Sequence, residues 1–344
     1  MGDLYLTGGE QRRDLFFPSE EWHSTKTAVA LRIDTDTTRV TDKLDYVTPC
    51  NACPDDDPAI LFKAATLCGN RLYVCTSTEV ITFELPSFQR VGYVSLPCFN
   101  DLHHVLPTPN GTLIVVVTGL DMVVEITPEG ETLREWSVVG EDTWSRFSRE
   151  VDYRKVATTK PHRAHPNFAF LLGDDIWTTR CDLKDVVCLT TPGRRIDVAV
   201  SFPHDGHIFR DWIYFTTVDG HIVIANSHSL KVERVFDLNT MDNPEGHVLG
   251  FCRGVLPVTE TLVWVGFTRL RPTKFVEKLH WLKSSNLNSK PTHIALYDLS
   301  AARCLREIEL AAHRMDLVFS IVAFPTVGEV DSLLASTGVR TCAG

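Results

Sequence analysis

The sequence predicts an all-β fold: a single β-propeller over residues 1–344, with six blades. Three observations lead to this prediction. A pattern of four short strands separated by turns occurs five times, the strand patterns at the two chain ends complement each other, and the longer segments between copies lack a strand pattern. A chain of 344 residues is long enough for such a ring of repeated sheets.

One copy runs from Phe99 to Trp136, FNDLHHVLPTPNGTLIVVVTGLDMVVEITPEGETLREW. Apolar strand patterns alternate there with turns at Asn110-Gly111 and Glu129-Gly130, and Asn-Gly is a strong hairpin signal. The copy therefore predicts a four-stranded antiparallel meander. The same order of strands and turns begins again at four other places: Phe62, His165, His204 and near Gly250.

The two ends of the chain predict a sixth blade. HRMDLVFSIVAFP, residues 313–325, has the pattern of an innermost strand, and TAVALRIDTDTTRVTDKLDY, residues 27–46, has that of two outer strands. Either DLYLTGG near the start or DSLLAST near the end supplies the second strand. A blade shared by both termini closes the ring and removes exposed sheet edges.

Residues 139–160 and 272–290 fit no blade, so seven blades is the structural alternative. Both segments read as helical or irregular insertions rather than strands. Loops of that length in a compact domain are often functional lids.

Composition limits the classes of binding partner and the cellular compartment that we expect. The net charge is −10 and the pI about 5.7, which argues against nucleic acid and anionic membranes as partners, because both need clustered Lys and Arg. The start of the chain lacks a signal-peptide pattern, and no apolar run approaches membrane-spanning length. Ten cysteines without a secretory signal fit a reducing compartment, so we expect a cytoplasmic protein.

Histidines gather where the innermost strand of each predicted blade begins. Eight of the thirteen lie there: His103, His104, His162, His165, His204, His207, His247 and His313. The first full blade has Lys63 in that place. Three interpretations stay open: a divalent metal site, a metal-free acid/base and anion site, and hydrogen bonds that join neighbouring blades.

The metal interpretation predicts one inward-pointing histidine from each pair, because side chains alternate along a strand. The predicted ligands are His104, His165, His207 and His247. Imidazole ligands alone do not distinguish Fe, Zn, Mn and Cu. His103 is then a spare histidine that moves protons.

Arginines in the fifth copy predict a binding site for an acidic group. Arg253 begins an inner strand, while Arg269 and Arg271 follow the next strand, and antiparallel neighbours bring these ends to one face. Guanidinium groups bind carboxylates in a bidentate manner. The alternative is salt bridging to Glu260 or Glu277. We take His103, Arg253 and Arg269 as the catalytic candidates.

The cysteine pair Cys50 and Cys53 forms a CxxC, but no second CxxC completes a four-thiolate zinc site. A surface loop is the expected setting for this pair. Asp55 to Asp57 lack the ligand spacing of a calcium loop and predict a solvated turn.

Two segments resemble known propeller families. The blade from Asp101 to Trp136, with DLHHVLPTPNGTLIVVV, resembles a blade of the bacterial arylsulfotransferase-like propellers. In that family a channel histidine takes part in sulfuryl transfer, and the resemblance implies this role for His104 or His103. GFCRGVLPVTETLVWVGFTRLRP, residues 250–272, resembles the TRGL…VGLSxxR segment of uncharacterised bacterial propellers, which implies a propeller fold in a biosynthetic setting.

These observations predict a cytoplasmic propeller enzyme that binds a small polar or acidic metabolite in a funnel lined by His and Arg. A divalent transition metal is the expected cofactor, for lyase, isomerase or oxidative chemistry. The alternative is a non-catalytic scaffold that contacts another protein at its rim through 139–160 and 272–290, with Trp144 and Trp281. A further alternative is sulfuryl transfer by a channel histidine.

Overall fold

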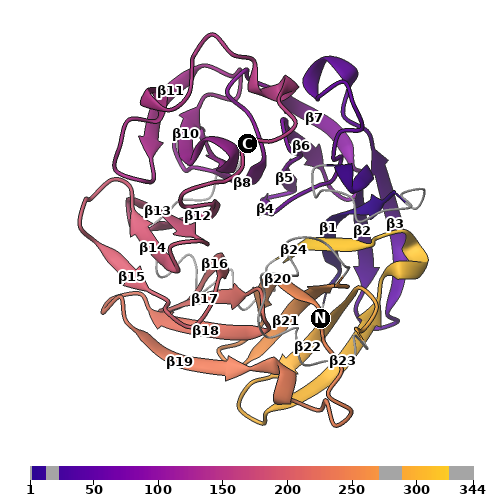
Figure 1. The fold of residues 1–344 in the computed structure, drawn as a ribbon. Helices are drawn as coiled ribbons and strands as arrows, with labels where there is room; N and C mark the ends of the chain where they lie inside the picture. Colours follow the sequence, from indigo (N-terminus) through magenta and orange to yellow (C-terminus); the bar gives the residue numbers. More distant parts are fainter. Residues whose placement is uncertain (1, 13–22, 271–288, 325–344) are drawn as a thin grey trace.

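The computed structural model describes residues 2–12, 23–270 and 289–324, and it forms a six-bladed β-propeller. Six four-stranded antiparallel sheets surround a central axis, and β4, β8, β12, β16, β20 and β24 are their innermost strands (Figure 1). The predicted fold class is confirmed. We number the blades 1 to 6 in the order of these inner strands.

The strands of each blade follow one another outward from the axis. Blade 1 contains β4 (Ala65–Cys68), β5 (Arg71–Cys75), β6 (Val80–Glu84) and β7 (Gln89–Val94). Blade 2 contains β8 (Leu102–Pro107), β9 (Leu113–Val117), β10 (Met122–Ile126) and β11 (Thr132–Ser137). Blade 3 contains β12 (Pro166–Leu172), β13 (Asp175–Arg180), β14 (Asp185–Cys188) and β15 (Arg195–Asp197).

Blade 4 contains β16 (Pro203–Phe209), β17 (Trp212–Thr217), β18 (His221–Asn226) and β19 (Val232–Asp237). Blade 5 contains β20 (Phe251–Pro257), β21 (Leu262–Thr268), β22 (His293–Asp298) and β23 (Arg303–Glu309). Short 3₁₀ turns occur in the connections, at η2 (Cys50–Ala52), η3 (Thr118–Leu120), η6 (Leu238–Thr240) and η9 (Ala311–His313).

Blade 6 joins the two ends of the chain, as the sequence predicts. β24 (Leu317–Ala323) is its inner strand, followed by β1 (Leu4–Gln11), β2 (Thr25–Asp34) and β3 (Arg39–Tyr46). The second strand is therefore the DLYLTGG segment. Gly8 lies so close to β24 that a Cβ there would be 1.8 Å from the carbonyl oxygen of Leu317, which explains glycine at this position.

The hydrophobic core lies between neighbouring blades. Tyr5 and Ala30 of blade 6, for example, pack with Leu72 and Phe83 of blade 1, and all four are buried. Strands that are covered on both faces need apolar residues on both, which explains runs such as LIVVV in β9. Burial between blades fixes the ring, and the ring brings the six inner strands together at the axis.

The insertion at 139–160 contains two 3₁₀ turns, η4 (Thr143–Ser145) and η5 (Tyr153–Lys155), and no strand, as predicted. The Asn100 side chain donates to the carbonyls of Tyr153, at 2.8 Å, and Val156, at 2.7 Å, and so holds the insertion against blade 2. Of the second predicted insertion, residues 272–288 lie outside the described residues. In the described ranges no helix is long and apolar enough to cross a membrane.

The inner strands share an irregularity that positions the site. In blades 2 to 6 the pairing of the inner strand with its neighbour shifts register, so that one or two inner residues have no direct opposite. The residues passed over are His103, Asn167, Asp205 with Gly206, Gly254, and Phe319. Such bulges turn side chains away from the regular alternation of a strand.

Candidate functional site

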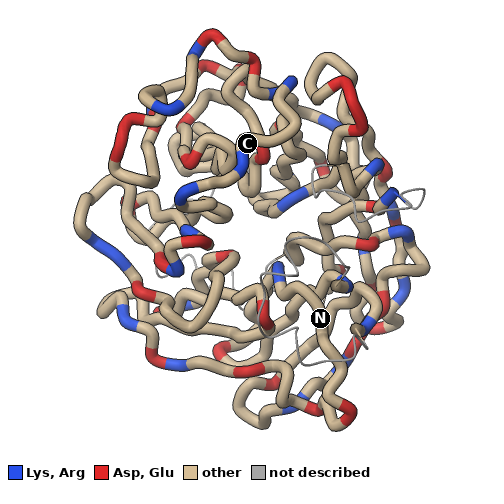
Figure 2. The backbone as a smooth tube through the Cα atoms, viewed as in Figure 1, with Lys and Arg blue, Asp and Glu red and all other residues tan. Residues whose placement is uncertain are grey.

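A cavity of about 80 Å³ opens at the end of the channel where the inner strands begin. Four charged side chains line it: Lys63 of blade 1, Asp101 of blade 2, Arg253 of blade 5, and Lys160 from the insertion. His103 and Phe319 complete the part of the wall nearest the axis. Three cationic groups and one carboxylate therefore surround a small space in a chain of net charge −10. Figure 2 shows Lys and Arg segments bordering the central opening.

Lys63 is the buried cation of the cavity, because only 5% of its side chain is exposed. Its backbone N–H donates to the carbonyl of Cys75 at 2.8 Å, and its own carbonyl accepts from the Thr7 hydroxyl at 2.7 Å. Blades 1 and 6 thus hold the residue from both sides. The ammonium group donates to Oδ1 of Asp101 and lies 3.3 Å from Nδ1 of His103.

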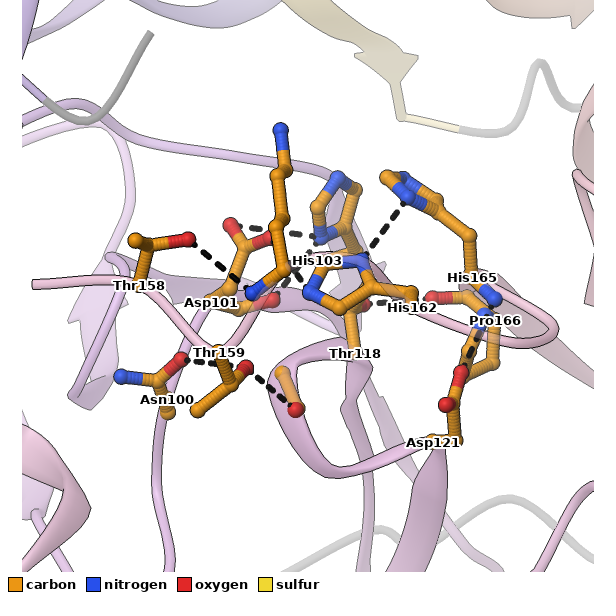
Figure 3. Close-up of polar contacts among 12 residues, drawn as sticks. Asn100, Asp101, His103, Thr118, Asp121, Thr158, Thr159, His162, His165 and Pro166 are labelled. Carbon is orange, nitrogen blue, oxygen red and sulfur yellow. Dashed lines mark hydrogen bonds and ion pairs between the residues drawn. The ribbon is translucent and has the colours of Figure 1, made fainter. Parts of the chain in front are cut away.

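Asp101 is the only carboxylate of the cavity wall among the described residues. It has a left-handed backbone (φ +49°) directly before β8, and its Oδ2 lies 3.9 Å from Nε2 of His162 (Figure 3). Burial opposes ionisation, yet Lys63, His103 and His162 hold the pKa of Asp101 well below its usual value. Asp101 is therefore a carboxylate at neutral pH and balances Lys63.

The contacts of His103 define which of its ring nitrogens carries the hydrogen. Its Nδ1 lies 2.9 Å from the backbone carbonyl of Asp101, which can only accept, so the geometry assigns the proton to Nδ1. The lone pair of the neutral ring is then on Nε2. Burial, followed by the charge of Lys63, lowers the pKa of His103 well below 6.5. His103 is thus a neutral base in the resting site.

Three further histidines surround His103. The ring of His165 lies 4.9 Å from it and the ring of His204 6.1 Å, measured between centroids. His162 lies between Asp101 and His165, with its Nδ1 3.1 Å from Nδ1 of His165, so one of these two nitrogens carries a hydrogen (Figure 3). Burial lowers the pKa of His162 and of His204. Blades 2, 3 and 4 therefore contribute a group of imidazoles at one level of the channel.

Asp121 positions the segment that carries His162 and His165. Its carboxylate accepts the backbone N–H groups of Arg163, Ala164 and His165 at 2.9 to 3.0 Å, and a 3.0 Å bond from the Arg146 guanidinium. The sequence analysis missed Asp121. No local signal reveals it, because the N–H groups that donate to its carboxylate lie 42 to 44 residues away in the chain.

Arg253, a predicted catalytic residue, lies at the cavity as expected. Its guanidinium group covers the ring of Phe319 at 4.5 Å from the centroid, which fixes its direction toward the axis. In blade 4, the side chain of Asp205 accepts hydrogen bonds from the Thr216 hydroxyl at 2.6 Å and from the Gly254 N–H at 2.9 Å. Burial raises the pKa of Asp205 to about 6. Arg269 differs: it is exposed beyond the end of β21 and does not line the cavity.

His104 does not point into the channel, contrary to the alternation argument. The register shift passes over His103, so His103 turns to the axis and His104 points between blades. There Nδ1 of His104 accepts the Ala169 N–H at 3.2 Å, and Nε2 donates to the Thr66 hydroxyl at 2.9 Å. Its ring stacks on Phe168 at 3.8 Å. Neighbouring blades therefore bind both ring nitrogens of His104. This agrees with the third interpretation of the histidines, in which their hydrogen bonds join neighbouring blades.

The four predicted metal ligands are not brought together. His104 and His207 both contact the Phe168 ring, His165 packs on His103, and His247 pairs with Glu245 at 3.1 Å. In blade 4 the register shift places His204, rather than the predicted His207, beside His103. Among the residues that the structure describes, no group of three or more His, Cys, Asp or Glu side chains is placed to hold a metal ion.

Of the two CxxC cysteines, only Cys53 lines the cavity; it is buried, whereas Cys50 is exposed. All nine cysteines of the described ranges are free thiols. His313 lies in η9 and takes no part in the cavity wall.

Comparisons with known proteins identify the fold. No family model and no curated protein matches the chain. A protein of unknown function from Bacteroides caccae is similar in structure, with a TM-score of 0.57 and 11% identity over 93% of this chain and 98% of that one. Because the identity is so low, this similarity shows a shared fold alone.

Two other solved structures are also similar. Streptogramin B lyase aligns with a TM-score of 0.48 and 11% identity, over 90% of this chain and 88% of the lyase. The β-propeller domain of Cps50 (Swd1) from Myceliophteria thermophila aligns with a TM-score of 0.46 and 10% identity, over 82% of each chain.

Proposed function

We propose that the protein is an enzyme that binds a small anionic metabolite in the channel cavity and transfers a proton to or from it. One observation carries the proposal: Lys63, Lys160 and Arg253 line one small cavity with a single carboxylate, although the chain as a whole is acidic. A local positive potential in an acidic protein favours an anionic ligand.

The size of the cavity limits the ligand. A buried water needs roughly 10–15 Å³ on this scale, so a cavity of about 80 Å³ accommodates about five to eight non-hydrogen atoms. Small carboxylates, phosphate and sulfate fall in this range. Arg253 is the group suited to bind them, because a guanidinium donates two parallel hydrogen bonds to a carboxylate or phosphate.

The histidines supply the acid/base part of the proposal. A group that accepts a proton at neutral pH must be unprotonated there, and burial keeps His103, His162 and His204 neutral. Of these, His103 lines the cavity and has its Nε2 lone pair available. We assign it the role of general base.

The expected divalent metal is not part of this proposal, because the predicted ligands occupy separate places. Elemental analysis of the purified, chelator-washed chain without a histidine tag tests this choice. About one transition-metal ion per chain would overturn the metal-free assignment and make the channel histidines ligands.

Calorimetric titration with acetate, pyruvate, phosphate and sulfate tests the proposed binding. We expect at least one of these anions to bind, and Arg253→Met to weaken its binding by about tenfold or more, which is about 1.4 kcal/mol. Arg269→Met is the matched control, because Arg269 belongs to the same blade but lies outside the cavity. Equal effects of the two substitutions, or no binding of any anion, would contradict the proposal.

The sulfate titration also bears on sulfuryl transfer, the second candidate. The observation that favours a channel histidine for it is the cavity position of His103. Of the two histidines that the resemblance offers, His104 has both ring nitrogens occupied, so the role would belong to His103.

A scaffold function has less support from the described residues. Its predicted contact residue Trp144 is half-buried, donates to Glu135 at 2.7 Å and is covered by the Arg149 guanidinium at 4.2 Å. The indole thus makes intramolecular contacts instead of forming an exposed aromatic surface. Trp281 lies outside the described residues.

A further inference from the structure

We propose that Lys63 is the covalent catalytic residue of this site and forms a Schiff base with the carbonyl group of a small 2-oxo acid. The inference rests on the proposed function, since it takes the channel cavity as the substrate site. It goes further by naming a substrate class and a reacting atom, Nζ of Lys63.

The first argument is the position of the amine. Surface lysines are long and solvated, whereas the Lys63 side chain is 5% exposed and lines the cavity. Its backbone is bound on both sides, to Cys75 and to Thr7. The chain therefore places a single buried amine at a fixed point of the cavity wall, as nucleophilic catalysis by lysine requires.

The second argument is the pair of groups that contact Nζ. Asp101 accepts its hydrogen bond and is the carboxylate in direct contact with Nζ, so it lies within reach of the proton that the ammonium must lose before it attacks. The Nδ1–H of His103, 3.3 Å away, directs its positive end toward the amine and does not stabilise the ammonium form. Nζ therefore has a proton acceptor and a hydrogen-bond donor in direct contact with it.

The step then balances without a further reactant. Asp101 takes one proton from the Lys63 ammonium, and the amine lone pair forms a bond to the carbonyl carbon. The carbonyl oxygen receives two protons, the one that Asp101 returns and a second one from the attacking nitrogen, and leaves as water, while the nitrogen lone pair forms the C=N bond. Ammonium and ketone thus give a protonated imine and water, with Asp101 ionised again at the end and no electrons gained or lost.

The third argument is the second anchor of the cavity. Arg253 lines the cavity from blade 5 and Lys63 lines it from blade 1. After burial, the charges of both residues contribute to the lowered pKa of His204, which lies near them. A 2-oxo acid has a carboxylate for Arg253 and an adjacent carbonyl for Lys63. A three-carbon acid such as pyruvate is within the size that the cavity allows.

The imine gives His103 a defined task. A protonated imine withdraws electrons from the neighbouring carbon and makes its C–H bonds acidic. The Nε2 lone pair of His103, assigned above, is then the base that removes such a proton. The pair would therefore catalyse exchange of the pyruvate methyl hydrogens with solvent.

Reductive trapping tests the inference on the unaltered protein. The full chain is incubated with pyruvate, reduced with sodium borohydride and analysed by intact mass and peptide mapping. We expect one reduced adduct per chain, located on Lys63, and a much faster incorporation of deuterium into the pyruvate methyl group in D₂O than without protein.

Two variants locate the reacting amine. Lys63→Arg keeps the charge beside Asp101 but cannot form an imine, so we expect pyruvate binding without trapping or exchange. Lys155→Arg is the control, because Lys155 belongs to the insertion, pairs with Asp55 and does not line the cavity, so it should leave trapping intact.

The outcomes separate this inference from the proposed function. If pyruvate binds in the calorimeter but no adduct forms on Lys63, or adducts appear only on other lysines, the inference is overturned and anion binding stands. If neither pyruvate nor any other anion binds, the proposed function fails, and the inference fails with it.

Discussion

The carboxylate of Asp121 accepts the backbone N–H of His165, 44 residues further along the chain, at 3.0 Å. Asp121 ends η3 in blade 2 with a left-handed backbone (φ +49°), and His165 directly precedes β12 in blade 3, also with a left-handed backbone (φ +51°). One buried carboxylate therefore fixes the backbone segment that carries two of the channel histidines, His162 and His165. It links the packing of neighbouring blades to the geometry of the site.

We expect Asp121→Ala to lower the free energy of unfolding by about 3 kcal/mol or more, because it leaves several buried N–H donors and the Arg146 guanidinium without their acceptor. It should also weaken anion binding at the cavity through the displaced histidines. Urea unfolding and calorimetry measure the two effects. Asp142→Ala removes an exposed cap of η4 and is the control, with an expected cost of about 1 kcal/mol. A cost for Asp121→Ala as small as the control's would show that Asp121 does not hold this segment.

The neighbours His103 and His104 should respond in opposite ways to substitution. His104→Ala removes a stacked ring and two hydrogen bonds between blades, so we expect it to cost about 2–4 kcal/mol of stability. Anion binding should be nearly unchanged in the protein that still folds. His103→Ala should cost less stability but abolish the exchange reaction. If His104 rather than His103 were needed for the exchange reaction, the assignment of His103 as the channel residue would be wrong.

The contrast between these two histidines shows what the sequence could predict. Strand and turn patterns repeat locally, so the number of blades, the closure by both termini and the strand-free insertion at 139–160 followed from the chain alone. The gathering of histidines where the innermost strands begin was also visible in the sequence. Alternation along a strand then selected His104 and His207 for the channel, but the register shifts at His103 and at Asp205 reverse that choice. Such shifts depend on pairing with β9 and β17, which no local pattern specifies.

Stability should fall as the pH drops below about 6.5. Six histidines have a lower pKa in the fold than the usual 6.5, with burial as the main cause: His103, His104, His162, His204, His207 and His293. A group with a lowered pKa binds protons more readily in the unfolded chain. Unfolding therefore takes up protons between the two pKa values, and acid favours the unfolded state there.

Two groups oppose this trend. Burial raises the pKa of Asp205 to about 6, and a hydrogen bond to Asp219 raises the pKa of His221, so each binds protons more readily in the fold. Six groups against two should leave a net loss of stability on acidification. Urea unfolding at pH 7, 6 and 5 measures the slope, and a flat profile would contradict the expectation. For His207, whose pKa falls from 6.5 to about 4, His207→Phe should reduce the pH dependence by about 3 kcal/mol when the series is extended to pH 4.

Closure of the ring predicts a large effect at a single glycine. A Cβ at Gly8 would lie 1.8 Å from the carbonyl oxygen of Leu317, which is backbone of β24 and cannot turn away as a side chain could. Gly8→Ala must therefore separate β1 from β24, the two strands that join the chain ends, and we expect a loss of several kcal/mol or a chain that fails to close. Gly2→Ala is the control, because nothing lies within 4 Å of its Cβ position. Thermal unfolding compares the two, and channel ligand binding provides a second readout, since Leu317 and Phe319 of β24 line the cavity. If Gly8→Ala unfolded at the same temperature as Gly2→Ala, the β1–β24 contact would not be what closes the propeller.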